Sequence, residues 1–247
     1  MTDGSSNKGG VQSFSEWRPV VFWFLFASLV VFHLVANVWW QALDIRPVRT
    51  DEEVHMQTAR DYYVAFTERP KQDNPLKLLI DVASVRPGNP VHPPLLHMLG
   101  ALMILVRGYS LDTISLTVTW LFLLAMPGCY LIARRFLGPW QALFATFVFS
   151  FTPIIYGSSR WFMTDFLSMT IVVWAVYALL RTDYFHNTLW VFIFAILNGL
   201  GILARTTTFL FYLAPCAALV LWGLWLALRS CGDSGSHCAR GTAPRAE

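Results

Sequence analysis

The first long apolar stretch of the chain, Val20–Leu43, reads VVFWFLFASLVVFHLVANVWWQAL and contains no charged residue. At about 1.5 Å per residue, a helix over this stretch can cross a hydrocarbon core of about 30 Å. It is too long for the apolar core of a signal peptide, and no small-residue cleavage signal follows it. Trp39 and Trp40 near its end suit the aromatic belt at a membrane surface. We therefore expect Val20–Leu43 to span the membrane and to remain as an anchor.

The composition of the whole chain also indicates a membrane protein. Of its 247 residues, 55% are hydrophobic and 13% are charged, and the mean hydropathy is +0.50. Soluble domains carry about 25% charged residues, so roughly half of the usual charge is missing. Neither a G-x-G-x-x-G run nor a P-loop occurs in the sequence. This balance excludes a soluble enzyme, a disordered chain and, despite a net charge of +3, a protein that binds nucleic acid.

Further apolar runs follow at intervals that suit membrane crossings. The longest, Leu189–Leu228, would measure about 60 Å as one helix, which is twice the thickness of the hydrocarbon core. It must therefore form two crossings, and Arg205 with Thr206 marks the break. Pro94–Val106 is short for a crossing and suits a re-entrant or interfacial helix. The predicted spans are Val20–Leu43, Thr113–Ala133, Trp140–Tyr156, Phe162–Leu180, Leu189–Ala204 and Thr207–Leu228.

Basic residues predict the orientation of these six spans. If Pro94–Val106 does not cross, six basic residues fall on one side of the membrane: Lys8, Arg18, Arg134, Arg135, Arg181 and Arg229. The positive-inside tendency makes this side the cytoplasm. We thus predict an all-α integral membrane protein with about six transmembrane helices and with interfacial helices in a large first extracytoplasmic loop, 44–106. Residues 1–19 form a cytoplasmic tail, 20–228 form the transmembrane module, and 229–247 form a polar, disordered cytoplasmic tail.

An acidic run, Thr50-Asp51-Glu52-Glu53, lies near the start of the predicted outer loop. One interpretation is structural, because Thr50 and Glu53 fit a capping box and acids in a first helical turn are favoured by the helix dipole. The other interpretation is functional, because a carboxylate at a membrane surface can act as a general base. Both can hold, since a helix cap can also fix a catalytic carboxylate in place.

Two further charged residues are predicted to face the same outer compartment. Asp165 begins an otherwise uncharged span, where an ionisable group is costly and marks a candidate functional site. Its structural alternative is a helix cap that pairs with Arg160. Arg205 lies beside Thr206, Thr207 and Thr208, and guanidinium and hydroxyl groups suit a phosphate. The alternative for Arg205 is a side chain that extends to the lipid headgroups.

Several polar residues are open to more than one interpretation. His92 precedes a Pro-Pro helix start, and its imidazole can donate to a phosphate, bind a metal ion or simply be solvated. His33, Asn37 and Asn198 lie within predicted spans, where polar side chains can mark a transport path. A small polytopic transporter or channel is therefore an alternative function, although the chain shows no inverted internal repeat.

The order of several motifs along residues 20–220 resembles one group of membrane enzymes. An acidic pair follows the first span, and a Pro-Pro-Leu helix start follows the loop. The stretch YLIARRFLG at 130–138 is similar to an A-R-R-x-x-G junction, and residues 150–165 are similar to an S-P…R…T-D segment. GLGILART at 199–206 is similar to a G-L-A-x-x-T-K-x-T run. Together they resemble the GT-C-fold membrane glycosyltransferases, specifically the dolichyl-phosphate-mannose–protein mannosyltransferase and aminoarabinose transferase group.

The resemblance implies transfer of a sugar from a polyprenyl-phosphate donor at the extracytoplasmic face. It leaves open the sugar and the acceptor, which can be a protein, a lipid or a glycan. It implies Asp51 as the general base, with Glu52 beside it, and Asp165 as a second acid that orients the acceptor or helps to hold a divalent metal ion. No ligand set in the sequence identifies such a metal. The substrate-binding residues that it implies are His92, Arg160, Arg205 and Thr206.

The end of the chain differs from the expected pattern of this group. Family members normally continue with further spans and often with an outer C-terminal domain, whereas this sequence stops soon after its sixth predicted span. We therefore expect a shortened member, present as a multi-pass protein of a plasma, inner or endoplasmic reticulum membrane. A non-catalytic truncated membrane subunit is the alternative to an active enzyme.

Overall fold

The computed structural model describes residues 13–45, 50–68 and 93–238, and every regular element within these ranges is a helix. This confirms the all-α fold class. The helices are α1 (Ser13–Leu43), α2 (Thr50–Glu68), α4 (Leu95–Arg107), α5 (Leu111–Ala133), α6 (Pro139–Phe151), α7 (Pro153–Ser158), α8 (Thr164–Arg181), α9 (Thr188–Ala204), the 3-10 helix η1 (Thr206–Phe209) and α10 (Leu210–Cys238).

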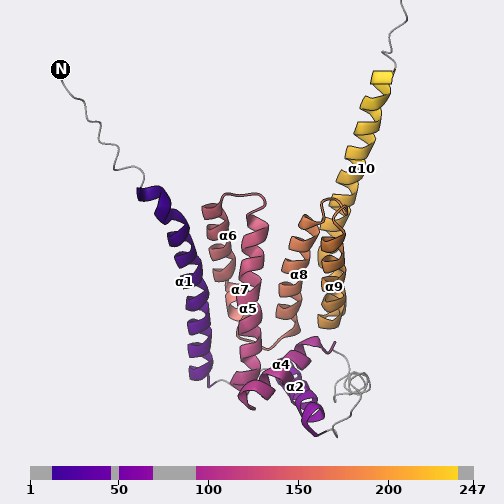
Figure 1. Ribbon diagram of the computed structural model, residues 1–247. Helices are drawn as coiled ribbons and strands as arrows, with labels where there is room; N and C mark the ends of the chain where they lie inside the picture. Colours follow the sequence, from indigo (N-terminus) through magenta and orange to yellow (C-terminus); the bar gives the residue numbers. More distant parts are fainter. Residues whose placement is uncertain (1–12, 46–49, 69–92, 239–247) are drawn as a thin grey trace, which may run out of the picture.

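The long helices form a bundle that is closed at one end by two shorter ones. In Figure 1, α1, α5, α6, α8, α9 and α10 run along a common direction, while α2 and α4 lie at one end of them. Helix α5 packs against α1, α4, α6 and α8, and α8 also packs against α9. The start of α1 and the end of α10 both lie at the end opposite to α2 and α4 (Figure 1).

Four helical segments are long and apolar enough to cross a membrane: Pro19–Leu43, Leu111–Ala133, Thr164–Arg181 and Thr206–Trp225. They correspond to four of the six predicted spans, which confirms an integral membrane protein. The other two predicted spans correspond to shorter helices, α9 and the pair α6 and α7. The short apolar helix α4 takes the place of the predicted re-entrant or interfacial helix.

The predicted span Trp140–Tyr156 is interrupted by a proline. Helix α6 ends at Phe151, Thr152 has an extended ψ of 124°, and α7 begins with Pro153. Proline has no backbone N–H to donate and disfavours a helical conformation in the residue before it. Pro153 therefore divides this span into two helices, and the second leads into the segment that precedes α8.

The predicted break between the last two spans is confirmed. Arg205 has extended backbone angles, with φ −160° and ψ 129°, between the end of α9 and the start of η1. At other helix starts, polar side chains accept from backbone N–H groups that would lack a partner. The Ser110 hydroxyl accepts from the Thr113 amide at 3.0 Å, and the Asn187 side chain accepts from the Trp190 amide at 3.4 Å.

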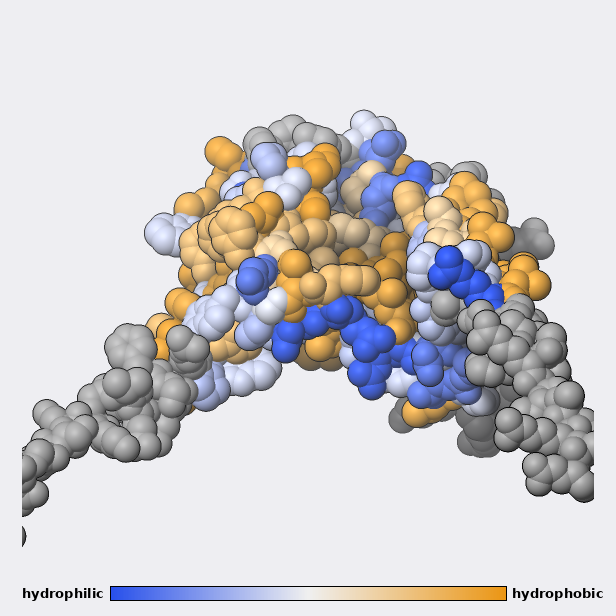
Figure 2. Space-filling model, turned by 90° about the horizontal axis from the view of Figure 1, so that it is seen from above, coloured by the Kyte–Doolittle hydropathy of each residue, from blue (hydrophilic) through white to orange (hydrophobic). Residues whose placement is uncertain are grey.

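Large apolar side chains cover the outside of the bundle. Trp23 and Phe24 on α1 and Phe192 on α9 are each more than 60% exposed. Viewed from above, Figure 2 shows hydrophobic residues along much of the outer rim and hydrophilic residues gathered along a concave edge. Such an apolar perimeter suits contact with lipid chains.

The buried core lies where α2 and α4 meet α5 and α8. Phe122, Phe162 and Phe166 are at most 3% exposed and belong to one cluster. Phe162 packs so closely on α4 that a Cβ added at Gly100 would lie 2.7 Å from its ring. The absence of a side chain at Gly100 therefore lets the segment before α8 approach α4.

Helix α10 is longer than the predicted span and continues to Cys238. Residues 229–238, predicted to begin an unstructured tail, are therefore helical in the structure. Gly232 and Gly235 lower the intrinsic helix propensity of this stretch, which is why its composition does not predict a helix. The remainder of the predicted tail, 239–247, lies outside the described residues.

Candidate active site

The acidic pair at the start of α2 has two different environments. Asp51 is exposed, whereas Glu52 is buried, with 7% of its surface exposed. Successive residues of a helix point about 100° apart, so the two carboxylates face different surroundings. The Glu52 carboxylate accepts a hydrogen bond of 2.8 Å from the backbone N–H of Phe162, just before α8. Glu52 thus joins α2 to that segment, while Asp51 remains open.

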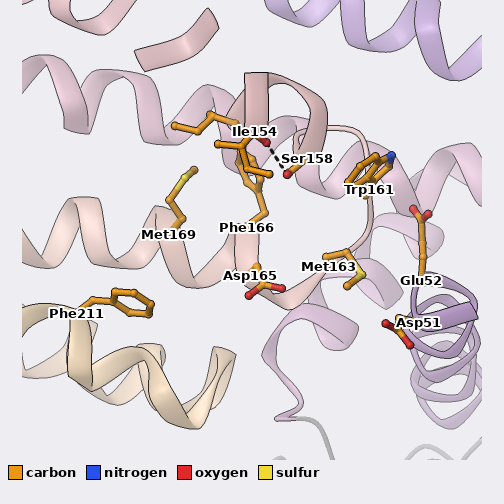
Figure 3. A pocket seen from close by; sticks show the side chains of 11 residues that line it. Asp51, Glu52, Ile154, Ser158, Trp161, Met163, Asp165, Phe166, Met169 and Phe211 are labelled. Carbon is orange, nitrogen blue, oxygen red and sulfur yellow. Dashed lines mark hydrogen bonds between the residues drawn. The ribbon is translucent and has the colours of Figure 1, made fainter. Parts of the chain in front are cut away.

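Both acids line a cavity of about 550 Å³ between α2, α7, α8 and α10. Figure 3 shows Asp51 and Glu52 at one end of it, Met169 and Phe211 at the other, and Asp165 between them. The remaining lining residues are Ile154, Ile155, Ser158, Trp161, Met163 and Phe166. The cavity therefore has an acidic end beside α2 and an apolar end beside α10.

Asp165 lies in the first turn of α8 and forms an ion pair with Arg205. Their side chains are 61% and 44% exposed, so solvent reaches both groups. The helix cap is the residue before the helix, Met163, which makes no capping hydrogen bond through its side chain. The structure thus corrects the structural alternative for Asp165, because this carboxylate is not a helix cap and its ion-pair partner is not Arg160.

Arg205 is the extended residue between α9 and η1, and three threonines follow it. Thr208 is fully buried, and its hydroxyl forms a hydrogen bond of 2.8 Å with the Ser168 hydroxyl of α8. Thr206 is exposed beside Arg205 and does not line the cavity. Because Thr208 is tied to α8, the turn that carries Arg205 is held close to Asp165.

Arg160, predicted to bind substrate, lies against α1. Its Nε donates to the Asn37 side-chain oxygen at 3.0 Å, and its guanidinium lies 4.2 Å from the ring centre of Tyr156 and 5.0 Å from that of Trp40. It is not among the residues that line the cavity. His92, which was also predicted to bind substrate, lies outside the described residues.

Helix α2 is fixed to α4 by a buried pair of histidines. The Nδ1 atom of His55 and the Nε2 atom of His97 lie 2.9 Å apart, and the rings stack with their centres 5.2 Å apart. The ring of Tyr62, also on α2, stacks with the His97 ring at a centre distance of 6.5 Å. Burial raises the pKa of the Tyr62 phenol. Since His55 lies one turn after Asp51, this contact also fixes the acidic end of the cavity.

The polar residues within the spans have partners or tight surroundings. Asn37 bonds to the segment before α8, and Asn198 donates to the Phe194 carbonyl of its own helix at 3.0 Å. His33 is fully buried among aromatic rings, with Phe151 and Phe122 at centre distances of 4.8 and 4.9 Å. Asn37 and His33 thus contact other helices, whereas Asn198 bonds within its own helix.

The described part of the chain contains no cluster of side chains that is suited to binding a metal ion. Within residues 13–45, 50–68 and 93–238, no three His, Cys, Asp or Glu side chains lie close enough together to hold one. Asp51, Glu52 and Asp165 line the same cavity without forming such a group. We therefore derive no step that passes through a metal ion.

Sequence reasoning did not identify the apolar wall of the cavity. Met169 and Phe211 belong to helices that are apolar throughout, so nothing in their pattern separates a cavity wall from a lipid-facing surface. The contacts of the segment 159–163 were not predictable either, although its resemblance to a family motif was noted, because they are made with residues that lie far away in sequence. Asn37 did give a signal, as a polar residue within a predicted span.

The fold and the cavity define a helical membrane protein with an acidic and basic site at one end of its bundle. A family profile described as dolichyl-phosphate-mannose-protein mannosyltransferase matches residues 91–231, more than half of the chain. The chain belongs to this family, which places it among membrane glycosyltransferases. No curated protein and no solved structure matches the chain.

The family match covers one side of the cavity. It runs from α4 into α10 and includes Asp165 and Arg205, whereas Asp51 and Glu52 precede it. The structure brings the two acids of α2 to the matched region through the hydrogen bond from Phe162 to Glu52.

Proposed function

We propose that the chain transfers a sugar from a polyprenyl-phosphate donor to an acceptor hydroxyl at the extracytoplasmic face of the membrane. The observation that carries this proposal is the cavity itself, which has Asp51 at one end, the Asp165–Arg205 ion pair beside it and an apolar wall at the other end. A donor of this class needs all three features, because it has a sugar, an anionic phosphate and a hydrocarbon chain.

Asp51 is the proposed general base. Glu52 already accepts from the Phe162 amide, whereas Asp51 is exposed and borders the cavity. Asp51 takes the proton of the acceptor hydroxyl as the acceptor oxygen bonds to the anomeric carbon. The bond from that carbon to the phosphate oxygen breaks, and the polyprenyl phosphate leaves with the bonding electrons. This single displacement inverts the anomeric carbon.

Arg205 is the proposed phosphate ligand. A guanidinium binds phosphate with paired hydrogen bonds and stabilises the negative charge that grows on the leaving group. In the structure Asp165 occupies this guanidinium, and both groups reach solvent. The donor phosphate would take the place of the Asp165 carboxylate, so Asp165 holds Arg205 in position while the site is empty.

The apolar end of the cavity supports a lipid-linked donor. Phe211 lies near the start of α10 and Met169 lies on α8, both within segments suited to crossing a membrane. A prenyl chain at this end would stay at membrane level while its phosphate reaches Arg205. The acceptor would then enter from the side of α2.

The distribution of basic residues supports the extracytoplasmic orientation. Arg134 and Arg135 follow α5 and Arg181 ends α8, and the Arg135 guanidinium donates to the Leu180 carbonyl at 2.9 Å. These arginines therefore lie together, at the other end of α8 from Asp165. The positive-inside tendency assigns their end to the cytoplasm and the cavity to the opposite face.

Replacement of Asp51 tests the proposed base. We expect Asp51→Asn to lower the rate of sugar transfer by about 100-fold or more, because general-base catalysis contributes about 10²- to 10⁴-fold. Glu53→Gln is the matched control, since Glu53 is an exposed acid in the same helical turn and lies outside the cavity. Transfer is measured with purified protein in lipid and a radiolabelled polyprenyl-phosphate sugar. Equal rates for Asp51→Asn and Glu53→Gln would reject Asp51 as the base.

A further inference from the structure

Asn37 is a buried amide in the interior of α1, and its side-chain hydrogen bonds within the described residues go to one short segment. Its Nδ2 donates to the Ser159 hydroxyl at 3.0 Å and to the Ser159 carbonyl at 3.4 Å, and its Oδ1 accepts from Arg160 Nε at 3.0 Å. The side chain is fully buried and lies within a membrane-spanning segment. Polar groups in such surroundings are costly unless they are paired.

The segment that Asn37 contacts, 159–163, joins α7 to α8 and forms part of the cavity wall. Trp161 and Met163 line the cavity, and Asp165 follows in the first turn of α8. Ser159 and Phe162 are fully buried, so the segment has little room to shift. Its position therefore determines where α8 begins and where Asp165 lies.

Two helices hold this segment from different sides. Glu52 of α2 accepts from the Phe162 amide, and Asn37 of α1 holds Ser159 and Arg160. Glu52 is next to Asp51, and Asp165 follows the segment in sequence, so the segment physically links Asp51 to Asp165. Asn37 does not line the cavity.

We propose that Asn37 is a positioning residue that acts on the cavity through the segment 159–163 and so sets the place of Asp165 relative to Asp51. The kinetic part of this inference rests on the proposed function, whereas the structural part does not. Loss of the amide leaves Ser159 and Arg160 without these hydrogen bonds and weakens the hold of α1 on the segment, although the contact of Arg160 with the Trp40 ring remains. Asp51 and Glu52 would remain on α2, while the start of α8, which carries Asp165, would be held less firmly relative to them.

Gln41 provides a matched control for Asn37. It lies about one turn further along α1, is 7% exposed, and donates to the Thr119 hydroxyl of α5 at 3.3 Å. Both residues are buried amides that join α1 to the rest of the bundle, but only Asn37 contacts the segment 159–163. A general loss of stability would affect both variants alike, whereas a positioning role is specific to Asn37.

Hydrogen–deuterium exchange of the full chain in lipid tests the structural part. We expect Asn37→Leu to accelerate exchange in the peptide that contains the Phe162 amide by about tenfold or more, because local opening with a lower free energy exposes that N–H. Ser159→Ala should produce a smaller acceleration, since the bond to the Ser159 carbonyl remains. Gln41→Leu should leave this peptide unchanged. Unchanged exchange in Asn37→Leu would overturn the inference, even for a protein with no transfer activity.

Kinetics then separate positioning from stability. We expect Asn37→Leu to lower kcat by about 10- to 100-fold, because Trp161 and Met163 of the segment line the cavity, and a shift of about 1 Å of the bound donor relative to Asp51 can cost that much. The donor KM should change by about fivefold at most, which is the limit for loss of the exposed Asp165–Arg205 pair, because Arg205 is not among the residues to which Asn37 hydrogen-bonds. An equal fall of kcat in Gln41→Leu would overturn the inference. If the wild-type chain transfers no sugar, the proposed function is rejected instead. The hydrogen–deuterium exchange result would still decide whether Asn37 positions the segment 159–163.

Discussion

Asp165 in the first turn of α8 forms an ion pair with Arg205, the extended residue between α9 and η1. Asp165 lines the cavity, and Arg205 is not among the lining residues but reaches Asp165 from the turn between α9 and η1. Because both side chains reach solvent, the pair can open without moving a buried group. This accessibility would let an anionic donor compete with Asp165 for the guanidinium, as the proposed function requires.

Removal of the guanidinium should weaken donor binding. We expect Arg205→Ala to raise the donor KM by about 10- to 100-fold, because a hydrogen bond to a charged group contributes about 1.5–3 kcal/mol. The acceptor KM should stay within twofold of the wild-type value. Arg181→Ala is the control, since Arg181 ends α8 at its other end and lies over the Trp190 ring. Equal increases in the donor and acceptor KM would contradict a phosphate role for Arg205.

Removal of the carboxylate should have the opposite effect on donor binding. In Asp165→Asn, the donor phosphate no longer competes with an anion for Arg205. An exposed ion pair contributes about 0.2–1 kcal/mol, so we expect the donor KM to fall by up to about fivefold. Steady-state kinetics at varied donor concentration measure this change. A rise in the donor KM like that of Arg205→Ala would show that Asp165 contributes to donor binding itself.

The close contact at Gly100 predicts a stability effect outside the catalytic groups. A Cβ there would lie 2.7 Å from the Phe162 ring and 3.1 Å from the Ala59 Cβ, and Phe162 and Ala59 are fully buried. We expect Gly100→Ala to destabilise the protein by about 1–3 kcal/mol, as overpacking does. Gly199→Ala is the control, because its Cβ would meet nothing within 4 Å. In a helix interior it should stabilise by up to about 1 kcal/mol. Thermal unfolding in lipid compares the two, and equal midpoints would contradict the packing described here.

The apolar end of the cavity predicts a dependence on the length of the donor chain. Phe211 is 62% exposed and lines the end away from Asp51. Phe211→Ala removes apolar contact area that only a long prenyl chain can reach, so we expect a larger rise in KM for a long-chain donor than for a short-chain one. Competition between donors of two chain lengths measures this difference. The same rise for both lengths would place the prenyl chain elsewhere.

Much of the fold follows from hydropathy, whereas the ends of several elements do not. The apolar runs predict helices α5, α8 and α9 within a few residues, whereas α1 begins at Ser13, before its predicted span Val20–Leu43, and Arg205 marks the break before η1 and α10. The break at Pro153 and the extension of α10 to Cys238 depend on local backbone geometry that the apolar pattern does not reveal. Periodicity and length identify a crossing, but a helix end is set by its caps and prolines.

The candidate site was predictable as a set of residue types rather than as a set of contacts. Asp51, Glu52 and Asp165 were identified as acids at the outer ends of spans, and the structure places them around one cavity. The partner of Asp165 was not predictable, since Arg160 is nearer in sequence while Arg205 is nearer in space. The hydrogen bond from the Phe162 amide to Glu52 also depends on tertiary packing. The sequence therefore indicated which acids and bases form the site, and the folded structure showed which of them pair with one another.

The central claim is that Asp51, Asp165 and Arg205 share one compartment, and labelling of single cysteines from each side of sealed vesicles tests it most directly. The four native cysteines are first replaced by serine or alanine, and a cysteine is placed in turn at positions 51, 165, 205 and 135. With a membrane-impermeant maleimide, positions 51, 165 and 205 should label from the extracytoplasmic side and position 135 from the cytoplasmic side. Labelling of 51, 165 and 205 from different sides would contradict a shared site.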